Sequence, residues 1–189
     1  QLHGHQCQRM RWHHNDHHHD GHTNHDHDPS GLWGLLPGRH DHLCRVWHGL
    51  RVPIQMDGVP GASQPPVETG STFTYDFAVP DAGLYWYHPH VMSAAQVGYG
   101  LYGPLLVEDP ADGVGVADTT TIVLSDIGFD GKGTLEDAES GGSAGMVFGR
   151  EGSYVLVNGR TRPTIKARAG APQRWRIVNS AKSRFFYLD

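Results

Sequence analysis

The chain has 189 residues, of which 38% are hydrophobic and 19% charged, which is enough for a core in one large domain or two small ones. Its formal net charge is -5 with histidine neutral, and no basic stripe stands out, so nucleic acid is not an expected partner. No run of about 18 apolar residues is present, so we expect neither a membrane span nor a membrane partner.

Histidine is abundant and unevenly placed. Of the 15 histidines, twelve precede residue 43, and the other three are His48, His88 and His90. Residues 1–42 are rich in His and Asp and have almost no apolar periodicity, so we predict a disordered segment there. Clustered imidazoles favour a metal-binding tract, and a compositionally biased tail without a specific role is the competing interpretation.

Residues 43–110 carry the first set of strand signals and are predicted to form a partial first domain. Apolar side chains alternate within residues 71–79, which is typical of a half-buried strand with one buried face, formed by Phe73, Tyr75, Phe77 and Val79. In chain order we expect a loop at 50–67, a strand at 71–79, a turn at 80–83, and strands at 84–88 and 100–108.

Residues 111–118 read as a linker, and residues 119–189 as the start of a second domain. The Asn158-Gly159 pair predicts a tight turn after one of its strands. The chain stops at residues 185–189 in what we predict to be mid-strand, so we expect a C-terminal truncation. The remaining expectations are strands at 119–124, 154–157, 164–168 and 173–178, with a Gly-rich acidic loop at 128–145.

No segment of useful length has the helical period, and Gly and Pro separate the short apolar runs throughout. The predicted class is therefore all-β, with short strands in a sandwich or barrel.

Three histidines outside the tract are candidate metal ligands. On an extended strand, His88 and His90 point to the same face with Cα atoms about 6.5 to 7 Å apart, so each can bind one ion of a metal pair. Pro89 between them stiffens this spacing. His48 precedes Gly49, where a small residue permits close backbone approach. Imidazole suits copper, zinc, iron and nickel alike, so these residues alone do not identify the metal.

Several blocks over about 65 residues resemble the first domain of bacterial multicopper oxidases, a family that includes laccases and cuprous oxidases. Residues 119–189 are similar to the start of the family's second domain, with weaker markers at 157–159 and 174–179. The resemblance implies cupredoxin-like Greek-key β-barrels, the first incomplete at its N-terminus and the second truncated at its C-terminus. The blocks of the first domain are 47–50, 56–61, 63–64, 73–75, 83–90 and 100–105.

The resemblance also implies roles for individual residues. His48 matches the second His of the family's His-Trp-His-Gly motif, and His88 and His90 match the next motif; all three would be ligands of the binuclear type 3 copper pair. Asp57 matches an acid that is thought to relay protons to oxygen, and its competing interpretation is a turn residue before Gly58. Trp86 is expected to pack against the imidazoles, or simply to fill the core.

This chain departs from the family in two respects. Val46 stands where the family has a His ligand of the type 2 copper, and an aliphatic side chain has no lone pair, so that site would be impaired. The third cupredoxin domain, which supplies the type 1 copper, is missing. Neither Cys7 nor Cys44 lies in the required His-Cys-His context, and they allow either one disulfide or two unrelated thiols.

The abrupt change of pattern at Val46 suggests a further hypothesis for the histidine-rich segment. A shifted reading frame or a gene-prediction error ending near Val46 would explain both that segment and the absent family motifs. One of the other two frames of the coding DNA should then encode a His before Trp47 and a β-rich lead-in.

The resemblance implies a periplasmic or secreted enzyme that oxidises a phenol, an aromatic amine or a metal ion by single electrons and reduces dioxygen to water. Its partners would be copper ions, dioxygen, the reductant and the missing C-terminal cupredoxin domain. We expect the chain alone to be inactive. The alternative is a non-catalytic copper-binding or storage module, favoured by the His/Asp tract. A cupredoxin of the nitrite reductase type is less favoured, because it would place a Cys beside the His, and residues 88–90 contain none. A purely structural β-sandwich is also less favoured, because it leaves the three histidines unexplained.

Overall fold

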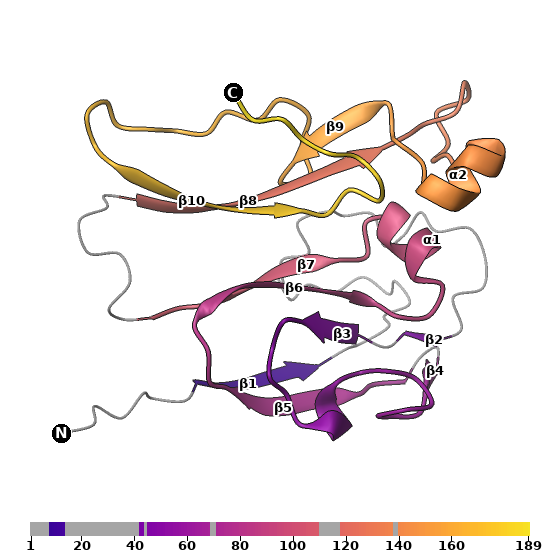
Figure 1. Cartoon of the computed structure of the whole chain (residues 1–189), viewed down its shortest axis with the longest axis vertical. Coiled ribbons are helices and arrows are strands. Elements are labelled where there is room, and N and C mark those ends of the chain that lie inside the picture. The colour runs from indigo at the N-terminus through magenta and orange to yellow at the C-terminus, as the bar shows by residue number, and fades with distance from the viewer. Residues whose placement is uncertain (1–7, 14–41, 44, 69–70, 110–117, 138–139) are drawn as a thin grey trace, which may run out of the picture.

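The computed structural model describes residues 8–13, 42–43, 45–68, 71–109, 118–137 and 140–189 (Figure 1). These residues form strands β1 to β10 with two short α-helices and a single 3-10 turn. The prediction of an all-β chain is confirmed. No helix in these ranges combines the length and apolar character needed to cross a membrane.

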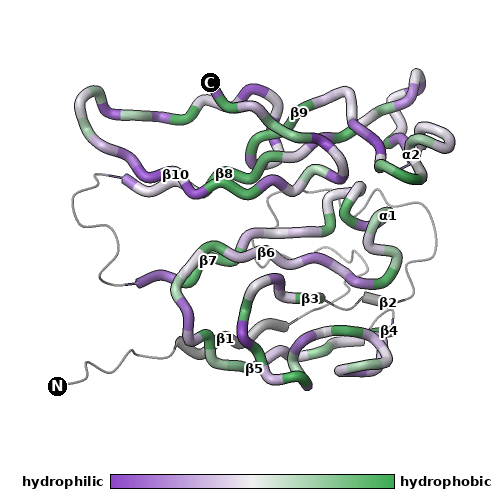
Figure 2. Tube along the Cα trace, in the orientation of Figure 1, coloured by the Kyte–Doolittle hydropathy of each residue, from purple (hydrophilic) through white to green (hydrophobic). Residues whose placement is uncertain are grey.

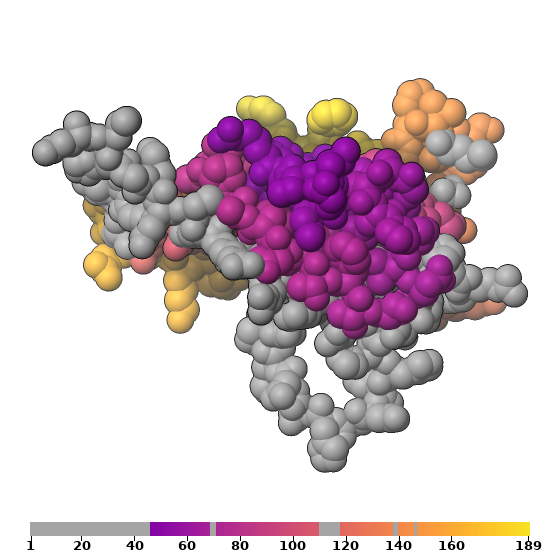
Figure 3. Space-filling model, turned by 90° about the horizontal axis from the view of Figure 1, so that it is seen from below, coloured from indigo at the N-terminus to yellow at the C-terminus, as the bar shows by residue number. Residues whose placement is uncertain are grey.

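Two sheets of the first half face one another. β3 (Arg45–His48), β6 (Gly83–Pro89) and β7 (Gly103–Val107) form an antiparallel sheet in the order β3-β6-β7. The second sheet pairs β1 (Gln8–His13) with β5 (Thr74–Val79), also antiparallel. A small ladder joins β2 (His42–Leu43) to β4 (Val67–Glu68). Figure 3 shows the face of the molecule on which the described residues of this half pack against one another.

Within the segment predicted to be disordered, residues 8–13 form β1 and residue 42 begins β2. The backbone of β1 pairs with β5 over six residues, and ladder hydrogen bonds need no apolar pattern in the added strand. The rest of the histidine-rich segment lies outside the described residues, as do Cys7 and Cys44.

The core of this half lies between β5 and the β3-β6-β7 sheet. Trp47 is 2% exposed and its indole contacts the rings of Tyr75 and Phe77 edge-on, at centroid distances of 5.3 and 5.4 Å. Val79 is buried on the same face of β5, so the predicted alternation is confirmed, although the strand begins at Thr74. Because side chains alternate along β3, the burial of Trp47 places His48 on the opposite face of the sheet.

The second half is a three-stranded sheet. β8 (Asp118–Ile127) lies between β10 (Gln173–Asn179), which is parallel to it, and β9 (Tyr154–Val157), which is antiparallel. β8 is rich in hydrophobic residues, whereas β10 is more hydrophilic (Figure 2). The predicted strand at 164–168 is wrong, and no strand forms at 185–189.

The turn at Asn158-Gly159 is confirmed. Both residues have positive φ, 49° and 72°, and Val157 and Arg160 exchange backbone hydrogen bonds across it. Two short helices were not expected, α1 (Ser93–Gly98) and α2 (Gly142–Phe148). Each has fewer than two full turns, too few residues to show a helical period in the sequence. The predicted linker lies outside the described residues except for Asp118, which begins β8.

Candidate metal centre

The outer face of the β3-β6 ladder brings two of the candidate ligands together. In the antiparallel register His48 lies opposite Trp86 and Val46 lies opposite His88, so the two histidines are diagonal neighbours on one face. Their Nε2 atoms are 2.7 Å apart, and their rings stack at 4.6 Å with an angle of 10°. Two imidazoles that are 40 residues apart in sequence therefore direct the same nitrogen to one point.

His90 completes a looser cluster. Its ring centroid lies 5.8 Å from that of His88 and 6.3 Å from that of His48, and its side chain is exposed beyond the end of β6. Within the described ranges, no group of three or more His, Cys, Asp or Glu side chains has the geometry of a complete metal site. The chain thus presents a converging pair and a third imidazole nearby.

The hydrogen bonds of His88 decide which of its nitrogens is free. Its Nδ1 lies 2.7 Å from the carbonyl oxygen of Pro89 and 3.1 Å from the hydroxyl of Ser93. A carbonyl only accepts, so Nδ1 carries the proton of the neutral ring and Nε2 keeps its lone pair. That lone pair points to Nε2 of His48.

The pair fits one metal ion. Imidazole nitrogens bind such ions at about 2.0 Å, so two of them on one ion lie within about 4 Å of each other. The observed Nε2–Nε2 distance of 2.7 Å is inside that limit. Neutral imidazole donors suit copper among other transition metals.

Electrostatics keep both rings in the form that binds metal. Burial lowers the pKa of His48 and of His88 below the ordinary 6.5, and the neighbouring His90 lowers both further. The negative charge of Asp57 acts in the opposite direction on the pKa of His48. The hydrogen bond to the Pro89 carbonyl oxygen likewise acts to raise the pKa of His88. Burial outweighs both effects, so both pKa values lie below the ordinary 6.5.

Asp57 ends the 3-10 turn η2 (Ile54–Met56), where its backbone N–H donates to the carbonyl oxygen of Ile54 at 3.2 Å. The structure therefore agrees with the interpretation of Asp57 as a turn residue. The carboxylate of Asp57 also lies close enough to His48 to raise the pKa of the imidazole. A role in proton transfer stays a prediction.

Other residues frame the histidine pair. Trp86 packs on both rings, at centroid distances of 5.6 Å from His48 and 4.6 Å from His88, which confirms the expected contact. Val46 is 8% exposed and offers no donor atom at the position where the resemblance calls for a ligand. Gly49 has a φ of 85°, and a Cβ there would lie 3.2 Å from the ring of Tyr85, so the close approach is also confirmed.

Sequence reasoning missed Ser93, because nothing in the sequence indicated the helix that carries it. Beside it lies a cavity of about 580 Å³, lined by Trp86, His88 and Ser93 from the first half and by Phe148 and Lys182 from the second. Arg150 of the second half donates through Nη2 to the carbonyl oxygen of Gly98, at 3.3 Å. The histidine pair thus borders the junction of the two halves.

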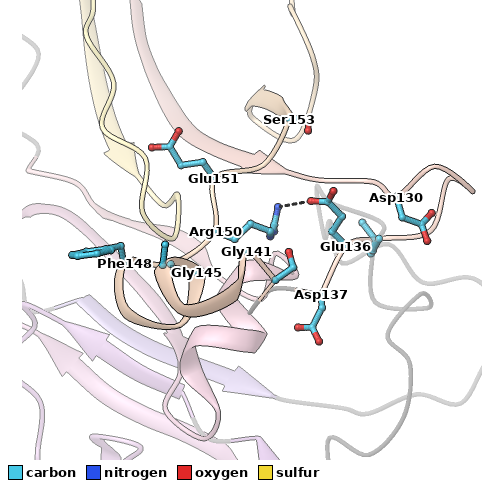
Figure 4. Close-up of a pocket in the computed structure, with 13 residues that line it drawn as sticks. Asp130, Glu136, Asp137, Gly141, Gly145, Phe148, Arg150, Glu151 and Ser153 are labelled. Carbon is cyan, nitrogen blue, oxygen red and sulfur yellow. Dashed lines mark ion pairs between the residues drawn. The ribbon is translucent and has the colours of Figure 1, made fainter.

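A second cavity, of about 650 Å³, lies in the second half around α2 (Figure 4). Its buried cation is Arg150, whose Nη1 is 4.0 Å from Oε2 of Glu136. Figure 4 shows these two side chains directed at each other, while Asp137 and Glu151 point elsewhere. The three histidines are not among its lining residues, so this cavity is separate from the metal centre.

Known proteins are similar in sequence to this chain. A family model described as multicopper oxidase matches residues 41–112, which include all three candidate ligands. The chain is 34% identical over 170 residues to the multicopper oxidase MmcO of Mycobacterium tuberculosis, covering 75% of this chain and 33% of that protein. It is 48% identical over 62 residues to copper resistance protein A of Pseudomonas syringae pv. tomato, covering 33% and 10%.

Solved structures give the same relationship. The crystal structure of a multi-copper oxidase from Pseudomonas thermotolerans superposes with a TM-score of 0.69 at 37% identity, covering 76% of this chain and 35% of that one. The fold is therefore all-β and cupredoxin-like. The chain spans a third or less of the length of the two curated relatives described above.

Proposed function

Since residues 41–112 belong to the multicopper oxidase family, we propose that this chain is part of a copper oxidase and holds ligands of its type 3 copper pair. The whole enzyme couples one-electron oxidation of a phenolic, amine or metal-ion substrate to the reduction of dioxygen to water. Copper, when bound, supplies the one-electron redox chemistry that side chains lack.

The single observation that carries the proposal is the convergence of His48 and His88. Their Nε2 atoms lie 2.7 Å apart, one of them with its lone pair free, and both pKa values are lowered. His48 and His88 hold one ion, and His90, on the same side of the sheet end, contributes to the second.

Two neighbouring side chains refine this role. Asp57 is close enough to act on the charge of His48, which supports its use as a proton donor at the cluster. Val46 gives no ligand, so a type 2 copper is held weakly or not at all on this side. A type 1 copper belongs to a further cupredoxin domain of the enzyme.

The remaining partners follow from the same chemistry: dioxygen, the reductant, and the cupredoxin domain that supplies the other ligands. We place the enzyme outside the cytoplasm, in the periplasm or secreted, as the family resemblance implies. The chain by itself is expected to be inactive, because it holds only part of the ligand set. Oxidation of a phenolic dye by the copper-loaded chain would contradict this.

The copper site is tested by titrating Cu⁺ into the chain labelled with ¹⁵N-histidine. We expect the Nε2 signals of His48 and His88 to shift together at the lowest Cu⁺ additions, because one ion binds both nitrogens. His88→Gln should abolish the shift of His48. His25→Gln, which removes one imidazole of the tract, is the control and should leave it intact.

The site-specific signals matter because the tract itself has many imidazoles. If Cu⁺ shifts only histidines before residue 43, the proposed site is wrong and a copper-storage role for the tract is the better interpretation.

A further inference from the structure

The hydroxyl of Ser93 lies beside the nitrogen of His88 that faces away from His48. Its Oγ is 3.1 Å from His88 Nδ1, which also contacts the Pro89 carbonyl at 2.7 Å. We propose that Ser93 is a positioning residue, which with that carbonyl holds the His88 ring so that the Nε2 lone pair faces His48. The consequence for copper rests on the proposed function, whereas the effect on the ring does not.

The argument depends on where the single proton of the neutral His88 ring resides. With the proton on Nδ1, two oxygens accept it and Nε2 is free to bind a metal. With the proton on Nε2, the ring donates to His48 Nε2 at 2.7 Å instead and offers no lone pair to an ion. The Pro89 oxygen would then face the lone pair of Nδ1, and because a carbonyl only accepts, this contact favours the metal-binding form. The Ser93 hydroxyl accepts from Nδ1 in that form and gives the ring a second point of attachment.

Helix α1 fixes Ser93 in place at the start of the helix. The side chain of Gln96 is 1% exposed, and its Nε2 donates to the carbonyl oxygen of Val91, which ties the helix to the segment before it. At the other end, Gly98 accepts from Arg150 of the second half at 3.3 Å. The Ser93 hydroxyl is thus anchored by a helix held at both ends.

The backbone before Ser93 is strained, which suits this role. Met92 has a φ of 44° and a ψ of 42°, a left-handed conformation that is unfavourable for a residue with a side chain. This turn brings α1 back towards the histidine-bearing strand, and contacts between α1 and β6 follow it. The surrounding packing must hold a conformation that the sequence alone disfavours.

The test uses the metal-free full chain with ¹⁵N-histidine and long-range ¹H–¹⁵N spectra, in which the His88 signals are assigned by their loss in His88→Gln. In the parent chain Nδ1 should be the protonated nitrogen. Ser93→Ala removes one of the two contacts to Nδ1 and should shift the His88 nitrogen signals, and Cu⁺ affinity at His88 should fall about 10-fold, as for other lost hydrogen-bond partners of metal ligands. Ser93→Thr keeps the hydroxyl and should resemble the parent chain.

The matched control is Ser63→Ala. The Ser63 hydroxyl also makes two hydrogen bonds, but both go to the backbone of Val59. If Ser93→Ala shifts the His88 nitrogens no more than Ser63→Ala does, the proposal is overturned. If Ser93→Ala does not fold, Ser93→Cys is used instead, because it keeps a side chain of similar size whose thiol forms weaker hydrogen bonds than the hydroxyl. Unchanged His88 signals in Ser93→Cys would overturn the proposal equally.

The two proposals fail in different ways. Cu⁺ that leaves His88 unperturbed in the parent chain refutes the copper site. The change of the His88 nitrogen signals in metal-free Ser93→Ala still decides whether Ser93 holds the ring.

Discussion

At the proposed metal centre the chemistry depends on which ring nitrogen carries a proton. His88 places its proton on Nδ1, towards two oxygens, and turns its Nε2 to His48. Burial lowers the pKa of both rings, so they are neutral over a wider pH range than a free histidine. The lowered pKa values favour the neutral form of both rings, which is the form of imidazole that can bind a metal.

This predicts an acid dependence of stability in the metal-free chain. A lowered pKa means that the folded rings bind fewer protons than the unfolded ones just below 6.5. Their contribution to stability is therefore fully present above pH 6.5 and is lost as the pH falls through the lowered values. Urea unfolding from pH 7.5 downwards should show this loss, and the slope below 6.5 should be shallower in His48→Gln/His88→Gln. An equal slope in both chains would contradict the assignment.

Among the elements, β3, β5 and β6 do most to place the site. Period-two alternation puts aromatic residues of β3 and β5 between the sheets and leaves the histidines on the other face. The strands are therefore readable from sequence, whereas α1 and α2 are not, because they are short and contain small residues. The segment 164–168 looked like a strand, yet it joins no strand ladder among the described residues.

The inter-sheet core should be sensitive to truncation. Phe77 is 4% exposed and its ring meets Trp47 at 5.4 Å, so Phe77→Ala leaves a cavity and should cost about 3–5 kcal/mol of the free energy of unfolding. Ala78→Ser on the exposed face of the same strand should change it by less than about 0.5 kcal/mol. Urea denaturation of both variants measures the difference, and equal losses would mean that the two sheets do not share this core.

In the whole molecule, the two halves meet where α1 approaches the second half. Arg150 is 5% exposed, donates to Gly98 of the first half, and lies 4.0 Å from Glu136. Its Nε and Nη1 have no hydrogen-bond partner among the described residues. A charge so placed depends on Glu136 for compensation.

We therefore expect an asymmetry between two variants. Glu136→Gln leaves the buried guanidinium without its ion-pair partner and should destabilise the chain by about 1–3 kcal/mol. Arg150→Met removes the charge altogether and should cost less. Thermal and urea unfolding of the two variants give the comparison. A larger loss in Arg150→Met would mean that the hydrogen bond to Gly98 outweighs the desolvation of the charge.

The sequence by itself determined the all-β class, most strand positions and the Asn158-Gly159 turn, because alternation and turn residues are local signals. Tertiary structure decided the rest. The 2.7 Å approach of His48 to His88 needs the register between β3 and β6, and the contact of Ser93 needs the turn at Met92 and the docking of α1. The pairing of residues 8–13 with β5 likewise depends on a distant strand edge. Such contacts join residues far apart in the chain, and no local pattern of side chains encodes them.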